Sequence, residues 1–88
     1  DLVCNGMQLH VKSHWRENNY PVSWVFQKRD KLTYAPSDKD YLCLVIMQTD
    51  FTSTLDIRHA KNVNYSPPKK ASLAKTKICI YEKELFRL

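Results

Sequence analysis

The sequence predicts an all-β domain, and two observations support this prediction. Apolar and polar residues alternate with a period of two in several short runs, which is typical of strands with one buried face. No segment shows a convincing apolar stripe at the 3.6-residue spacing of an amphipathic helix. We therefore expect five or more short strands, arranged as a sandwich or, alternatively, as a small β-barrel.

The expected strands are rich in Val, Ile, Thr and aromatic residues, the types that suit a pleated surface. They cover residues 3–11, 22–27, 42–47, 51–58 and 77–81. In the first run Val3, Met7, Leu9 and Val11 lie at one parity. The run 42–47 is apolar at both parities, so we expect it to form a strand that is covered on both faces.

Segments rich in Pro, Asn, Asp and Ser separate these runs and are expected to be loops. They are residues 17–21, 35–40 and 66–70. Proline fixes φ, while Asn and Asp tolerate turn geometry, so these residue types interrupt strands for a physical reason. The chain has no internal repeat, and its 88 residues are expected to form one β domain, 1–88.

The composition excludes several classes of protein. Hydrophobic residues make up 43% of the chain, too many for an intrinsically disordered protein. The longest apolar run covers residues 42–47, whereas a membrane-spanning helix needs about 20 residues. Because the chain does not begin with Met, we expect a processed product or a domain of a longer protein.

Residues that could carry chemistry are few, and we expect a protein that is not an enzyme and has no metal site and no cofactor. His10 and His14 are four residues apart, a spacing that suits a shared metal ion only on a helix. The local pattern is a strand that runs into a loop, so we do not expect these two to face together. Cys43 lies inside an apolar run, where a thiol is protonated and inert, which argues against a nucleophile built from Cys43 and His59.

The chain carries a net charge of +5, and its basic residues are unevenly distributed. Between residues 58 and 77 there is no acid, and the basic residues there are Arg58, Lys61, Lys69, Lys70, Lys75 and Lys77. Such a stretch is either a solvated loop or a surface for nucleic acid or another polyanion. Rings that could stack on unpaired bases are those of Trp15, Tyr20, Trp24, Tyr34 and Tyr65.

The three cysteines leave the redox compartment open. None of Cys4, Cys43 and Cys79 belongs to a CxxC pair, so a zinc knuckle has no support. In a cytosolic protein all three are thiols, whereas in a secreted protein two pair and one is left over. Cys4 and Cys79 lie on the first and last expected strands, which can be neighbours in a small sandwich, so these two are the candidates for a disulfide.

The two ends of the chain resemble ZP-N domains, the first half of the zona pellucida module. The segment 4–11 is similar to the family's opening strand, in which a Cys is followed by Met and alternating apolar residues. The segment 78–81 is similar to the closing strand, whose Cys is followed two residues later by Tyr. The middle of the chain matches poorly: Cys43 fits the second of the family's four cysteines, and no third is present.

This resemblance implies an immunoglobulin-like β-sandwich. It implies a disulfide between Cys4 and Cys79, because the family pairs its first cysteine with its fourth. Cys43 is then unpaired or available to another chain. The resemblance also implies an extracellular protein of egg coats or other filaments, which polymerises or binds a partner in gamete recognition at fertilization.

Our leading hypothesis is a secreted, non-catalytic module that works by contact with a protein partner or by self-association. Its partner surface is expected at an exposed sheet edge or at aromatic side chains, with Trp15, Tyr20 and Trp24 as candidates. Asn64 begins a triplet that fits the N-glycosylation pattern of secreted proteins, although Pro67 lowers its efficiency. The alternative is an intracellular basic β-domain that binds single-stranded nucleic acid or another polyanion.

Overall fold

A computed structural model describes residues 2–85, of which 48% are in strands and 13% in helices. The elements in chain order are β1 (Leu2–Cys4), β2 (Met7–Arg16), β3 (Ser23–Gln27), α1 (Lys31–Tyr34), β4 (Asp40–Gln48), β5 (Ser53–His59), the 3-10 helix η1 (Ala60–Asn62), β6 (Lys77–Tyr81) and α2 (Glu82–Leu85). The predicted all-β class is confirmed. No helix within the described residues has the length and apolar character needed to cross a membrane.

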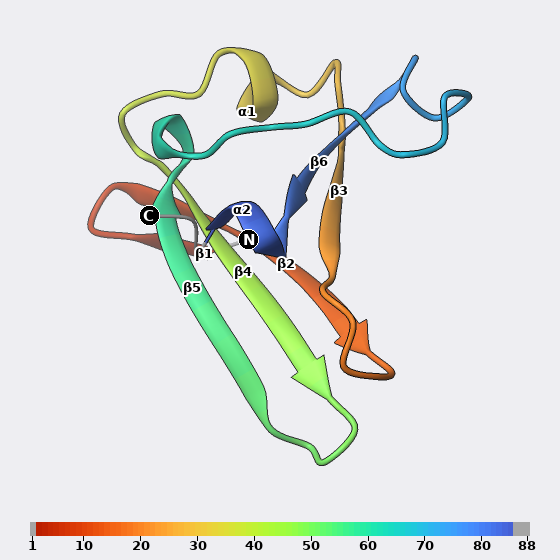
Figure 1. Ribbon diagram of the computed structural model, residues 1–88. Coiled ribbons are helices and arrows are strands. Elements are labelled where there is room, and N and C mark those ends of the chain that lie inside the picture. Colours follow the sequence, from red (N-terminus) through yellow and green to blue (C-terminus); the bar gives the residue numbers. More distant parts are fainter. Residues whose placement is uncertain (1, 86–88) are drawn as a thin grey trace.

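The strands form two sheets (Figure 1). The larger sheet has the strand order β1-β2-β4-β5, and the smaller one pairs β3 with β6 in antiparallel fashion. Within the larger sheet, β1–β2 and β4–β5 are antiparallel hairpins, while β2 and β4 run parallel. The sheets are not closed into a barrel.

The hydrophobic core lies between the two sheets and is built around β4. Leu42, Leu44 and Ile46 occupy alternate positions of β4 and are buried on the side of β3 and β6. The indole Nε1 of Trp24 donates a hydrogen bond to the carbonyl of Val45 at 3.2 Å, which ties β3 to β4 across the core. The core cluster comprises Val22, Trp24, Phe26, Leu32, Leu42, Leu44, Ile46, Ala60, Ile80 and Leu85.

Charged side chains of β2 and β5 close the core at its two sides. Arg16 of β2 donates from Nη2 to Oε2 of Glu82 at 2.7 Å, and Oε1 of Glu82 accepts from the Val22 amide at 2.9 Å. On the other side, Nη2 of Arg58 donates to the carbonyl of Leu85 at 2.6 Å. These bonds hold α2 over the end of the core. Arg16 of β2 and Arg58 of β5 therefore lie on the side of their sheet that faces the core.

A further polar pair joins β2 to β4. Nε2 of His10 lies 3.0 Å from Oδ1 of Asp40, and Oδ2 of Asp40 accepts from the Ser37 amide at 2.8 Å. The hydrogen bond with His10, followed by the bond from Ser37, lowers the pKa of Asp40 below its ordinary value. This pair fixes the start of β4 against β2, where the parallel pairing begins.

The expected single strand over residues 3–11 is wrong, because the chain turns within it. Asn5 and Gly6 have positive φ values of 51° and 78°, which suit a two-residue hairpin turn between β1 and β2. The other expected strands are present as β3, β4, β5 and β6. Phe51, which was expected to begin a strand, instead lies in the turn between β4 and β5 with φ of 67°.

Replacing Leu44 by Ala is expected to lower the free energy of unfolding by about 2–5 kcal/mol, because truncation leaves a cavity at a core position. Leu44 is only 1% exposed. The matched control is Leu73→Ala, an exposed position in the loop before β6, which should change stability by about 0.5 kcal/mol or less. Urea unfolding measures both variants, and equal losses would contradict this placement of the core.

Candidate interaction surface

The four-stranded sheet has a second face, called here the outer face, which points away from β3 and β6. Alternate side chains of a strand share a face, and residues paired across neighbouring strands point the same way, so the register assigns them. The outer face comprises Leu2 and Cys4 of β1, Met7, Leu9, Val11, Ser13 and Trp15 of β2, Tyr41, Cys43, Val45 and Met47 of β4, and Ser53, Leu55, Ile57 and His59 of β5.

The outer face is apolar and almost without charge. None of these described residues is Asp, Glu, Lys or Arg. The opposite side of the same strands carries Lys12 and Arg16 on β2 and Asp56 and Arg58 on β5. A sheet with one solvated face normally places its polar residues on that face, so the polarity of β2 and β5 is the reverse of the usual arrangement.

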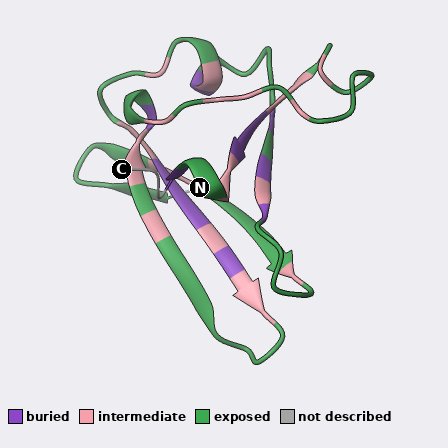
Figure 2. Cartoon of the chain, viewed as in Figure 1, coloured by how far each residue is buried: buried purple, intermediate pink, exposed green. Residues whose placement is uncertain are grey.

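The strands on both sides of β4 leave the outer face open to solvent. On β5, Leu55 is 65% and Ile57 60% exposed, while Leu2 of β1 is 61% and Trp15 of β2 52% exposed. Figure 2 shows β2 and β5 largely exposed on either side of the mostly buried β4. Single exposed apolar residues are normal, but a set of them over one sheet face is typical of surfaces that contact other molecules.

Within residues 2–85, the neighbours of β4 on its outer side are β2 and β5 of the same sheet. Cys43 is 5% exposed and pairs with Val11 of β2 and Ile57 of β5. Burial raises the pKa of the Cys43 thiol, which keeps it protonated. The expectation that this strand is covered on both faces is therefore wrong for the chain alone, because within residues 2–85 a second sheet covers only its inner side.

The β5 edge of the sheet is less suited to a partner than the outer face. β5 forms one edge and β1 the other, and Asp56 and Arg58 form an ion pair at 3.1 Å on the inner side of β5. Inward-pointing charges on an edge strand are a common device that opposes pairing with the edge of another sheet. The outer face is therefore the stronger candidate.

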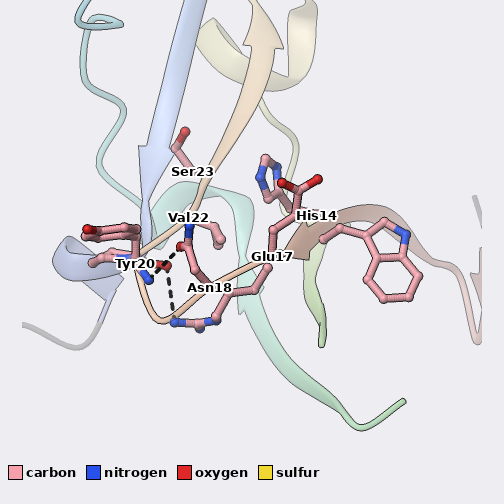
Figure 3. A pocket seen from close by; sticks show the side chains of 9 residues that line it. His14, Glu17, Asn18, Tyr20, Val22 and Ser23 are labelled. Atoms are coloured by element: carbon pink, nitrogen blue, oxygen red, sulfur yellow. Dashed lines mark hydrogen bonds between the residues drawn. The ribbon is translucent and has the colours of Figure 1, made fainter. Parts of the chain in front are cut away.

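A shallow depression adjoins the outer face at the end of β2 (Figure 3). Its volume is about 440 Å³, and it is lined by residues 14–18 and 20–23. The Tyr20 amide donates to Oδ1 of Asn18 at 3.1 Å, and Nη1 of Arg16 donates to the Tyr20 carbonyl at 3.4 Å, which shapes the turn. Trp15 and Tyr20, two of the predicted partner-binding residues, line this depression and are exposed.

The prediction that Trp24 binds a partner is wrong. Trp24 is 3% exposed and packs in the core, so it cannot contact a partner. Alternation along residues 22–27 correctly predicted a strand, but it does not tell which side of the strand is buried. In β3 the exposed apolar residue is Val25.

The basic stretch predicted from residues 58 to 77 does not form one surface. Arg58 is bound to Asp56, and Nζ of Lys61 pairs with the carboxylate of Asp38, which lowers the pKa of Asp38. These residues lie at the end of β5 and in η1, whereas the loop 66–76 lies on the other side of the molecule (Figure 1). The remaining residues of the stretch, in this loop and at the start of β6, are Lys69, Lys70, Lys75 and Lys77.

Two basic residues that sequence reasoning missed join the loop lysines. The Lys28 amide donates to the carbonyl of Thr76 at 2.9 Å, which brings residues 28–29 next to residues 75–77. The contact follows from the pairing of β3 with β6, which joins segments far apart in the sequence and which no local sequence pattern predicts. We call this group the basic end; it comprises Lys28, Arg29, Lys69, Lys70, Lys75 and Lys77.

Cys4 and Cys79 are not on neighbouring strands, contrary to the prediction, because β1 and β6 belong to different sheets. Cys4 is exposed on β1, whereas Cys79 is buried in β6, where the Ser66 backbone pairs with it. All three cysteines lie within the described residues as free thiols, and no two are within disulfide distance. The predicted disulfide is therefore absent from this structure.

The histidines are distributed among different contacts. β2 extends to Arg16, so His10 and His14 lie on the same face of one strand, contrary to expectation. They are roughly 13 Å apart along the strand, too far to share a metal ion. Nε2 of His59 lies 2.7 Å from the Asp38 carbonyl. Within residues 2–85 no three His, Cys, Asp or Glu side chains come together as a metal site requires.

The native protein should show one fast-reacting thiol and two slow ones. Cys4 is exposed, whereas Cys43 and Cys79 are buried, and the raised pKa of Cys43 slows its reaction further. Alkylation followed by intact mass measures this, with denatured, unreduced protein as the control in which all three should react. A single reactive thiol in that control would contradict the three free thiols, and peptide mapping would show whether Cys4 and Cys79 are the joined pair.

The function of the chain has to be inferred from its own surface. No family model, curated protein or solved structure matches the chain. Of the features described, the outer face departs most from the chemistry of an ordinary solvated sheet.

Proposed function

We propose that this chain is a non-catalytic protein-interaction module that binds a protein partner through the outer face. The observation that carries the proposal is the apolar, charge-free character of that face, with Leu55 and Ile57 more than half exposed. The partner that suits it is itself a flat, apolar protein surface, because a charged ligand finds no opposite charge there.

The fold assignment within this proposal is an immunoglobulin-like β-sandwich. Two sheets that share one core around β4 support it. In such domains side chains of both sheets interdigitate, as Trp24 does when its indole bonds to the backbone of β4. The second sheet has only β3 and β6, so it covers less area than the first.

The secreted, ZP-N-like origin of the module is also part of the proposal. It is supported by the sequence of the segments 4–11 and 78–81 and by the exposed position of Asn64 in a glycosylation triplet. It has no support from the cysteines, which are free thiols. The interaction function does not depend on this origin, because it follows from the outer face.

Site-specific photo-crosslinking tests the proposed function. A benzoylphenylalanine in place of Leu55 should give an adduct with a protein when cells that express the chain are irradiated. The matched control places the same probe at Val25, an exposed apolar position on β3 outside the outer face. Introducing Ile57→Lys should remove the adduct while changing the free energy of unfolding by about 1 kcal/mol or less, because position 57 is exposed.

Equal adducts from positions 55 and 25 would contradict a role for the outer face. So would the absence of any protein adduct from position 55 when the expressed chain is folded. Mass spectrometry of the adduct identifies the partner and shows whether it is another protein or a second copy.

A second candidate function is binding of a polyanion at the basic end. The hydrogen bond between Lys28 and Thr76 favours it, because that contact gathers basic residues from two separate segments. Tyr34 of α1 is exposed, and the Thr33 hydroxyl donates to the Lys28 carbonyl at 3.0 Å, so one ring is near this end. Single-strand binding normally uses several such rings along a basic groove, which ranks this candidate second.

Titration with labelled single-stranded DNA at about 50 mM and about 200 mM salt tests this candidate. If the basic end binds phosphates, the double variant Lys28→Glu, Lys75→Glu should weaken binding by about tenfold or more, whereas Lys39→Glu, an exposed position elsewhere, should have little effect. Weak binding that responds equally to both variants would rule out a specific polyanion site.

A further inference from the structure

We propose that the occupant of the outer face is a second copy of this chain, bound face to face about a twofold axis. This inference rests on the proposed function, since it names the partner of the same surface. In a twofold dimer the same patch serves on both subunits, so the patch has to be complementary to itself.

The distribution of charge supports a second copy. The chain carries +5, yet none of the described residues on the outer face is Lys, Arg, Asp or Glu. Two copies can therefore meet on this face without bringing like charges into contact. An apolar face also needs no opposite charge on its partner, so the same face of another molecule matches it chemically.

The geometry of the sheet supports the same conclusion. Two β-sheets pack face to face at about 10 Å when their inner side chains are apolar and interdigitate. β4 already packs in this way against β3 and β6 on its inner side. A second copy would cover the outer residues of β4, such as Val45 and Cys43. A strand that is apolar on both faces is normally covered on both.

The available area sets the expected strength. Strands of this length extend about 30 Å, and three neighbouring strands span about 15 Å, so roughly 500 Å² of each copy is covered. The total of about 1,000 Å² is close to the smallest area that specific interfaces bury. We therefore expect a weak, reversible dimer rather than a permanent one.

Sedimentation velocity across concentrations from about 1 µM to about 1 mM, the range in which weak, reversible dimers dissociate, tests the inference. The wild-type chain should change from monomer to dimer across this range. Ile57→Lys should weaken the dimer at least about tenfold, because it buries an unpaired charge in the interface. The control Val25→Lys makes the same change at an exposed apolar position outside the outer face and should leave the dimer intact.

Salt provides an independent readout. Raising the salt concentration screens the repulsion between two chains of +5, so an apolar dimer should hold or tighten. Association through charged groups or a bridging polyanion should instead weaken as salt is added. Circular dichroism and urea unfolding of both Lys variants confirm that a lost dimer reflects the interface and not the fold.

The outcomes separate the two proposals. A monomer at all concentrations would overturn self-association, and a crosslink from position 55 to a different protein would then leave the proposed function standing. A dimer that Ile57→Lys does not weaken would overturn the inference, because another surface would then form the contact. Equal weakening by Val25→Lys and Ile57→Lys would overturn it for the same reason. A dimer that dissociates as salt rises would overturn it as well.

Discussion

β4 is apolar at both parities, and its inner residues Leu42, Leu44 and Ile46 are the part of the core against which β3 and β6 pack. Its inner side chains are buried by β3 and β6, and this contact forms the core of an 88-residue chain. Among residues 2–85, its outer side chains lie between those of β2 and β5, and the second sheet lies on the other side. Residues beside β4 on the same face, such as Leu55 and Ile57, are apolar and more than half exposed. Burial that the chain leaves incomplete on this side is the physical reason to expect a partner.

The charged residues of the sheet are already used inside the fold. Arg16 and Arg58 hold α2 over the end of the core through Glu82 and the carbonyl of Leu85. Because these charged side chains lie on the side of the second sheet, the outer face has apolar side chains of β2 and β5 in contact with water. The same inward charges oppose edge pairing at β5, so at that side of the sheet the outer face is better suited to association than the edge.

Local patterns predicted the strands well but not their partners or their exposed sides. Alternation located β3 and the run that became β4, yet it placed Trp24 at the surface because parity alone does not say which side is buried. Asn5-Gly6 is a hairpin signal, but the alternation continues through it and concealed the turn. The parallel pairing of β2 with β4 joins segments about 30 residues apart, and it joins the two hairpins into the sheet that carries the outer face. The contact of Lys28 with Thr76 is equally non-local.

Hydroxyl-radical footprinting shows residue by residue whether the outer face is the surface at which this chain associates with protein. Oxidation is compared between dilute protein and protein in its associated state, whether the partner is a second copy or another chain. We expect protection at Trp15, Leu55 and Ile57, with no change at Val25 and Leu73, which are exposed elsewhere. Protection at Val25 or Leu73, with Leu55 and Ile57 oxidised as in the dilute protein, would contradict it.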